Sequence, residues 1–126
     1  MAKSARQKLT KQLDDIVRTI IRIRDNDKCQ KCGKHVEGSE SQISHVIPRS
    51  RCVALRWDFD NIKVFCTGCH LQWWHLNPTE SGQWFAEKYP DRMKHLDKHK
   101  REIKKWRISE LRELLADYKI ILKGLK

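Results

Sequence analysis

The chain has 126 residues, with 27 Lys or Arg against 16 Asp or Glu, so its formal net charge at pH 7 is +11. This length allows one modest domain with its own core. No run of about 18 apolar residues occurs, and no signal-type apolar segment follows the basic start, which argues against membrane spanning and secretion. We therefore expect a cytoplasmic protein.

The positive charge is concentrated at the two ends of the chain. Residues 1–24 and 91–126 have an excess of Lys and Arg, whereas the acids and bases of residues 25–90 balance. A basic protein most often binds a polyanion such as nucleic acid. An anionic membrane surface or simply solvated helix faces would also fit the charge. We expect DNA as the partner, contacted mainly by the flanking segments.

The first predicted element is an amphipathic helix from Lys3 to Arg24, ended by Asp25-Asn26-Asp27. Its apolar residues recur at three-and-four spacing, which is typical of one helical face. They are Leu9, Leu13, Ile16, Val17, Ile20 and Ile23. This stripe is expected to pack against the core or a partner helix. Pairing with a second copy of itself would give a homodimer.

Two Cys-x-x-Cys pairs follow, Cys29/Cys32 and Cys66/Cys69. Two such turns brought together present four thiolates, the tetrahedral set that structural Zn²⁺ prefers. Disulfides are the weaker interpretation, because five cysteines leave one over, which we take to be Cys52, an unpaired thiol without a metal role. A plain zinc ribbon is an alternative, although the segment between the pairs exceeds the ~15–20 residues usual there.

Between and after these pairs the pattern is strand, loop, strand and helix. Ile43 to Pro48 and Ile62 to Phe65 have strand character, and a helix is expected from Thr67, with Cys69 and His70 in its first turn. Further helical stretches follow at 80–88 and 91–105. Ser109 resembles the N-cap of a last helix.

These elements predict an α+β protein that is mainly helical. A small zinc-bound core at 26–77 would lie between a basic N-terminal helix at 1–25 and a basic helical region at 78–126, all within a single domain. Trp73, Trp74 and Trp84 are expected to form a small core over the zinc module. Trp57 lies in the loop before the second strand, where exposure would favour DNA contact.

Three polar residues in the central segment suggest phosphodiester chemistry. Neutral His45 is a candidate general base near neutral pH, and His70 is a candidate ligand for a divalent ion. The amide of Asn61 can bond in both directions and so fix the loop that presents His45. Each histidine taken alone is more often a surface or core residue than a catalytic one.

The order of these residues is informative. Ser-His45-Val-Ile-Pro-Arg-Ser, then Trp57-Asp-Phe-Asp-Asn61, then Cys-x-x-Cys-His70 resembles the HNH (ββα-metal) endonuclease signature. Together with Trp106, Glu110-Leu111, Tyr118 and Leu125-Lys126, the string resembles the NinG/Rap family of phage recombination nucleases, from about Cys29 to the C-terminus.

This resemblance implies a hairpin and a helix that hold one catalytic divalent ion, Mg²⁺ or Mn²⁺, with metal-dependent DNA cleavage assisted by His45. It also implies branched recombination intermediates as substrates and a phage-infected or bacterial host cell as the location. His75 is a candidate second ligand. It lies about 140° around a regular helix from His70, so it would reach the ion only if the helix were irregular there.

The chain departs from the HNH pattern in two places. Ser44 stands where such proteins often have a metal-binding Asp or His, and Trp74 stands where many have a further His. Asp58 or Asp60 could supply a carboxylate instead, although loop capping is their more ordinary role. A non-catalytic, zinc-stapled DNA-binding module is therefore the alternative function. In either case we expect nucleic-acid contacts from basic residues near the base and in the tail: Arg49, Arg51, Lys98, Lys100, Arg101, Lys104 and Lys105.

Overall fold

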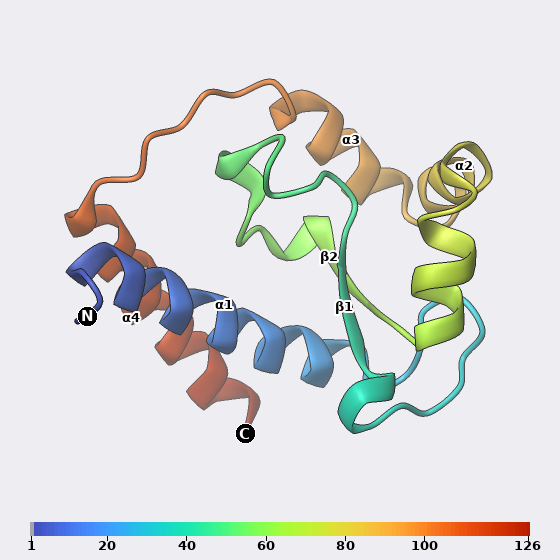
Figure 1. The fold of residues 1–126 in the computed structure, drawn as a ribbon, viewed down its shortest axis with the longest axis horizontal. Helices are drawn as coiled ribbons and strands as arrows, with labels where there is room; N and C mark the ends of the chain where they lie inside the picture. Colours follow the sequence, from blue (N-terminus) through green and yellow to red (C-terminus); the bar gives the residue numbers. More distant parts are fainter. Residues whose placement is uncertain (1) are drawn as a thin grey trace.

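The computed structural model describes residues 2–126 and has a mainly helical α+β fold (Figure 1). Its principal elements are α1 (Ala5–Arg24), β1 (Gln42–His45), β2 (Ile62–Phe65), α2 (Pro78–Lys88), α3 (Pro90–His99) and α4 (Ile108–Leu125). A π-helix, Gly68–Trp74, follows β2. The expected class, α+β and mainly helical, is confirmed. None of the helices in the described part of the chain combines the length and apolar composition needed to cross a bilayer.

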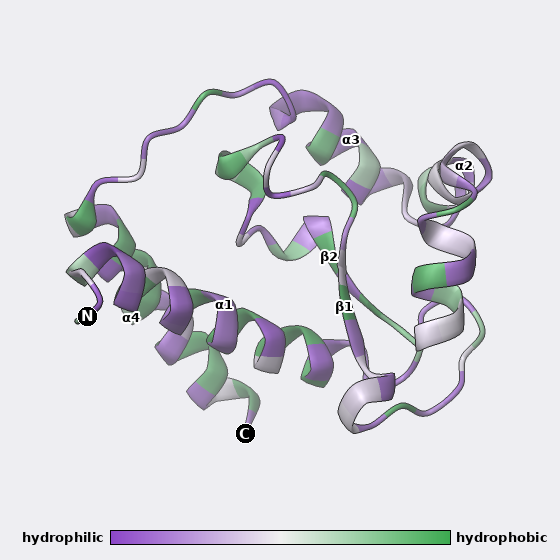
Figure 2. Ribbon diagram, in the orientation of Figure 1, coloured by the Kyte–Doolittle hydropathy of each residue, from purple (hydrophilic) through white to green (hydrophobic). Residues whose placement is uncertain are grey.

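Helix α1 forms where its apolar stripe predicts it. Ser4 caps its start, because the amide of Gln7 donates to the Ser4 hydroxyl at 3.1 Å and the Gln7 side chain accepts from the Ser4 amide at 2.9 Å. Leu13 and Ile21 are fully buried. The helix runs beside α4, and Figure 2 shows apolar residues on both. The stripe is therefore covered within one chain and is not free to pair with a second copy.

The two strands form an antiparallel hairpin in which Ser44 pairs with Lys63 and His45 with Ile62. The first strand ends at His45, so its predicted extension to Pro48 is wrong. Beyond His45 the chain leaves the strand, and the amide of Ile47 bonds to the side chain of Asn61 at 2.7 Å instead of to a neighbouring strand. The hairpin therefore presents His45 at its end, where the loop begins.

The C-terminal region is less helical than predicted. Helix α3 ends at His99, and residues 100–107 run without a regular element to α4. In this segment Ile103 is 95% exposed, whereas Trp106 packs edge-on against Trp57 with ring centroids 5.6 Å apart. The N-cap of α4 is Arg107, not Ser109, and the amide of Arg107 donates to Glu110 at 2.9 Å.

The aromatic residues after the second cysteine pair form a small core, as expected. Trp73, Trp74 and Trp84 surround Phe65, with ring centroids 6.2, 5.5 and 5.9 Å away. Trp57, whose exposure would have favoured DNA contact, is buried. Only 4% of it is accessible, and its indole N–H donates to the carboxylate of Asp14 at 2.8 Å.

Candidate metal centre and histidine pocket

The four paired cysteines converge at one point. Their sulfur atoms all lie within 4.8 Å of one another. The Cys32 and Cys66 sulfurs are 3.8 Å apart, close to the edge of about 3.8 Å that a tetrahedron with Zn–S bonds of about 2.3 Å has. Gly33 adopts φ of 79°, a conformation that glycine tolerates best, directly after Cys32. The set can hold a zinc ion, and Cys52 lies outside it.

The turn also prepares Cys29 to act as a thiolate. Burial raises the pKa of the Cys29 thiol, but hydrogen bonds from the backbone of Cys32, Cys66 and Lys31 outweigh that effect and bring the pKa to about 7. Cys29 and Cys32 follow the end of α1, whereas Cys66 and Cys69 join β2 to the π-helix. A zinc ion bound here would tie these segments together.

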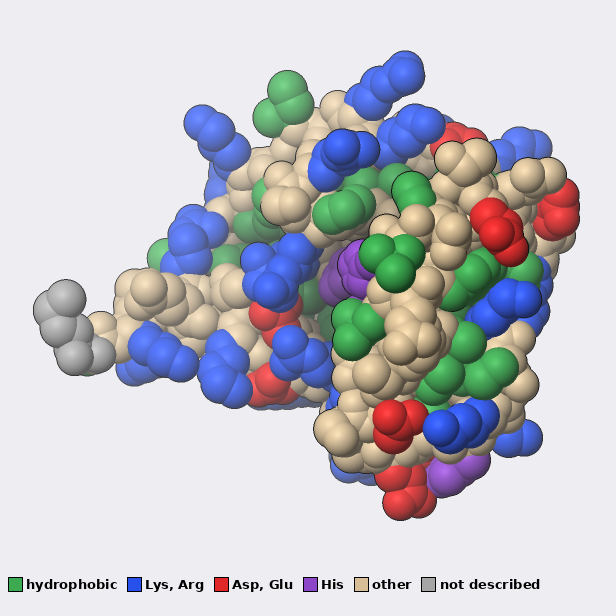
Figure 3. Space-filling view, turned by 45° about the vertical axis from the view of Figure 1, so that its right-hand side comes forward, with side chains coloured by type: hydrophobic (Ala, Val, Ile, Leu, Met, Phe, Trp, Pro, Cys, Tyr) green, Lys and Arg blue, Asp and Glu red, His purple; other side chains and the backbone are tan. Residues whose placement is uncertain are grey.

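A hollow of about 480 Å³ lies between α1, the hairpin and the π-helix, and it brings the three predicted histidines together. His45, His70 and His75 line it with Ser44, and three arginines complete its charged wall: Arg18, Arg49 and Arg56. Figure 3 shows histidine side chains recessed in a hollow edged by Lys and Arg. We refer to it as the histidine pocket.

Hydrogen bonding fixes the tautomer of His45. Its Nε2 lies 3.0 Å from the backbone carbonyl oxygen of Arg56. A carbonyl can only accept, so Nε2 carries the hydrogen and Nδ1 keeps its lone pair. Burial lowers the pKa of His45 and outweighs the opposing effect of the hydrogen bond to the Arg56 carbonyl, so the ring is neutral at pH 7. Nδ1 is therefore ready to accept a proton.

Asn61 is fully buried and bridges the loop in the way its amide allows. Its oxygen accepts from the amide of Ile47 at 2.7 Å, and its nitrogen donates to the carbonyls of Ile47 and Leu55 at 2.9 and 3.0 Å. These bonds tie the segment after His45 to the segment before β2. Asn61 thus fixes the loop and does not line the pocket.

The π-helix places His75 over His70. The amide of His75 donates to the carbonyl of His70, five residues back, so the two side chains share a face that a regular helix would separate. Their Nε2 atoms are 3.0 Å apart, and His70 Nδ1 lies 3.3 Å from the side-chain oxygen of Gln42. Burial lowers the pKa of His70 to about 4, with smaller effects from His75 and Lys63, which leaves its ring neutral.

Comparison with known proteins identifies the family of the chain. The family model described as Bacteriophage Lambda NinG protein matches residues 1–126. The chain belongs to the NinG family. No curated protein and no solved structure gives a significant match. The family match includes α1 and so extends further toward the N-terminus than the expected likeness from about Cys29.

In this NinG-family chain, Ser44 is not a free ligand. Its side chain is buried, and its hydroxyl accepts a hydrogen bond of 3.1 Å from the amine of Lys63, which is also fully buried. The strand register places the two opposite each other. Lys63 was not singled out from the sequence, because a lysine in a strand is ordinarily a surface residue.

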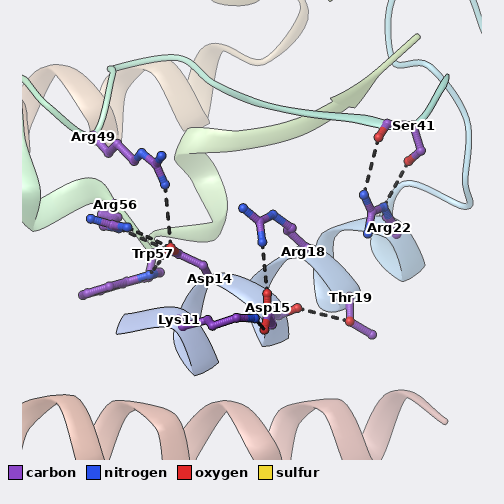
Figure 4. Close-up of polar contacts among 10 residues, drawn as sticks. All are labelled: Lys11, Asp14, Asp15, Arg18, Thr19, Arg22, Ser41, Arg49, Arg56 and Trp57. Atoms are coloured by element: carbon purple, nitrogen blue, oxygen red, sulfur yellow. Dashed lines mark hydrogen bonds and ion pairs between the residues drawn. The ribbon is translucent and has the colours of Figure 1, made fainter. Parts of the chain in front are cut away.

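Asp14 is a second residue that sequence reasoning missed. Its carboxylate accepts from Arg56 at 3.1 and 2.8 Å and from the Trp57 indole, and it lies 3.7 Å from Arg49 (Figure 4). Burial raises its pKa, but the bonds from Arg56 and Trp57 outweigh that effect and the net pKa is lowered. Asp14 therefore holds both arginines at the rim of the histidine pocket.

Asp58 and Asp60 do not contribute carboxylates to the histidine pocket. They lie with His95 and Tyr118 in a separate hollow of about 470 Å³. Asp58 accepts from the amide of Asp60 at 2.9 Å and from His95 Nε2 at 2.7 Å. The alternative that either acid completes a metal site at His70 is therefore wrong, and Asp58 instead caps its loop.

The predicted nucleic-acid residues are dispersed. Arg49 lines the histidine pocket, and Arg51 is exposed nearby in the chain. Lys98, Lys100 and Arg101 lie at the end of α3 and just after it, outside that pocket. Lys104 pairs with Glu110 at 2.6 Å, beside Lys105 in another hollow. The tail residues thus form no continuous surface with the histidines.

Proposed function

We propose that this NinG-family protein is an HNH-type, metal-dependent DNA endonuclease. The observation that carries the proposal is the histidine pocket: a base with a defined free nitrogen, His45, shares one hollow with a facing imidazole pair, His70 and His75. The family resemblance implies branched or recombination-intermediate DNA as the substrate.

The imidazole pair suits a divalent ion. Two ligands bound at about 2.1 Å and at right angles to each other are about 3.0 Å apart, which is the distance between the two Nε2 atoms. Two nitrogen ligands favour a transition metal such as Mn²⁺ over Mg²⁺, which prefers oxygen. When bound, such an ion would neutralise the charge that develops on the scissile phosphate.

The protein residues supply the remaining parts of the reaction. Nδ1 of His45 takes a proton from the attacking water as its oxygen forms a bond to phosphorus and the bond to the leaving sugar oxygen breaks. The Arg56 carbonyl holds the ring in the required tautomer, and Asn61 holds the loop. Arg49, which is 53% exposed at the rim, can bind the phosphate.

The Ser44–Lys63 pair favours the alternative, a non-catalytic zinc-stapled DNA-binding module. It leaves the position beside His45 without an anionic ligand, so the ion has two histidines and must take its other ligands from water or DNA phosphate. In that alternative the histidines are structural, and the protein binds DNA without cleaving it.

The deciding experiment compares wild type with His45→Ala on supercoiled DNA and on a four-way junction, with Mn²⁺ or Mg²⁺. Loss of a general base should lower the cleavage rate by about 10²–10⁴-fold while binding persists. His35→Ala is the matched control, since His35 is an exposed histidine paired with Glu37 and lies outside the pocket. Intact DNA with wild-type protein under every divalent ion tested would contradict the proposal and favour the binding module.

A further inference from the structure

The groove along α1 is continuous with the histidine pocket. A hollow of about 650 Å³ follows this helix from Lys3 to Arg18. It shares four lining residues with the histidine pocket: Asp14, Arg18, Arg49 and Arg56. The two hollows therefore form one groove that starts near the N-terminal end of α1 and ends at the histidines.

The charge of this groove is strongly positive. Six basic residues line it, Lys3, Arg6, Lys11, Arg18, Arg49 and Arg56, against two acids, Asp14 and Asp15. Both acids are already paired within the chain. Asp15 contacts Lys11 at 2.8 Å and Arg18 at 3.0 Å, and Asp14 contacts Arg56 at 2.8 Å (Figure 4). The ion pairs of Asp15 with Lys11 and Arg18 are exposed and weak, so these two bases can exchange the carboxylate of Asp15 for a DNA phosphate.

We propose that this face of α1 binds the sugar-phosphate backbone of duplex DNA and leads it into the histidine pocket. The inference rests on the proposed nuclease function and specifies its substrate path. The helix advances about 18 Å from Arg6 to Arg18, which spans about five phosphates of one strand at about 3.4 Å each. The basic side chains are thus spread over the length of a backbone segment.

The composition of the groove favours a duplex over a single strand. Single-stranded DNA is usually held by aromatic side chains on which bases stack. Within residues 2–126, Trp57 is the one Trp, Tyr or Phe that lines either hollow, and it is buried. Backbone contacts without stacking position a paired strand and carry no sequence information. The groove should therefore bind duplexes and duplex arms of junctions with little sequence preference.

The test removes three charges from the groove and compares the result with a matched change elsewhere. Lys3→Gln, Lys11→Gln and Arg18→Gln are combined in one variant. Arg112→Gln, Lys119→Gln and Lys123→Gln, at exposed positions of α4, are combined in the control, which changes net charge equally outside the groove. Fluorescence anisotropy of a labelled duplex is measured across a NaCl series without added Mg²⁺ or Mn²⁺. Circular dichroism confirms that both variants are folded.

The groove variant should reduce the slope of log K against log salt by about 2.7, or about 0.9 for each phosphate that the protein no longer neutralises, and the control should keep the wild-type slope. An unchanged slope in the groove variant, or an equal reduction in the control, would overturn the inference. So would tighter binding of single-stranded DNA than of duplex, or α1-dependent binding to phosphatidylserine vesicles without duplex binding. Cleavage is not the readout of this test. A protein that binds DNA through α1 but never cuts it would therefore contradict the proposed nuclease function and leave the inference about the groove intact.

Discussion

Lys63 is a fully buried lysine in the middle of β2. Among residues 2–126, the one hydrogen bond of its amine goes to the Ser44 hydroxyl, and the Trp74 ring centroid lies 3.6 Å away. Burial, and then repulsion from Arg92, moves the pKa of Lys63 well below its usual value of 10.5, with a smaller opposing effect from Asp25. The lysine therefore destabilises the folded state most at pH values at which it is protonated in the unfolded chain.

Replacing this residue should change how stability depends on pH. Between the lowered pKa of the folded state and 10.5, the unfolded chain binds more protons, so the free energy of unfolding rises with pH in this window. Lys63→Met removes that dependence and should flatten the curve below pH 10.5, where the lysine contributes a slope of up to about 1.4 kcal/mol for each pH unit. Chemical denaturation with zinc present measures it. Lys94→Met, at an exposed position on α3, should keep the wild-type slope, and parallel curves for Lys63→Met and wild type would contradict the prediction.

At the scale of elements, the spacing of apolar residues predicted α1 correctly. The sequence after Thr67 also predicted a helix, but not that this helix would be a π-helix. The stripe of α1 repeats every three or four residues and is buried where expected, as at Leu13 and Val17. The residues after Thr67 also predict a helix, but their register is set by distant contacts. Trp74 packs on Phe65 and Lys63, while Cys66 and Cys69 hold the start of the helix. Local sequence does not reveal such contacts.

Because residues 68–74 form a π-helix, we predict that a histidine at position 74 cannot replace His75 as the second imidazole. His75→Ala should weaken Mn²⁺ binding about as much as His70→Ala. The double variant Trp74→His with His75→Ala should not restore it, because residue 74 is buried against Lys63 and faces the core, away from His70. Isothermal titration of the zinc-loaded protein measures this, with the exposed neighbour Leu76→Ala as a control. Restored affinity in the double variant would indicate a regular helix with His70 and residue 74 on one face.

At the scale of the whole molecule, the sequence predicted the cysteine cluster and the three histidines but not what surrounds them. Cys-x-x-Cys spacing and the His45, Asn61 and His70 order are local patterns, so they could be recognised without a structure. Asp14 and Lys63 act through partners far along the chain, Arg56 and Ser44. The basic groove of α1 also depends on how that helix meets the loop bearing Arg49. Neither these long-range pairs nor the groove can be predicted from the spacing of residues along the chain.

The cysteine cluster should control the geometry of the histidine pocket at a distance. It joins the turn after α1 to the β2–π-helix junction, at the end of the hairpin away from His45, so it fixes the start of the helix that leads to His70 and His75 relative to α1 and the hairpin. Structural zinc contributes about 10–16 kcal/mol of binding free energy in small zinc domains, which is comparable to the whole stability of a typical domain, about 5–15 kcal/mol. Cys66→Ser should therefore lose the one zinc ion bound per chain, and its melting temperature should fall sharply. The variant should also lose Mn²⁺ binding at the histidines. Cys52→Ser removes a thiol that lies outside the cluster and donates to the carbonyls of His99 and Glu102, so this variant should retain the zinc and the proposed Mn²⁺ site. Metal analysis of both purified variants, together with thermal denaturation, makes the comparison, and full zinc content in Cys66→Ser would show that the ion is held elsewhere.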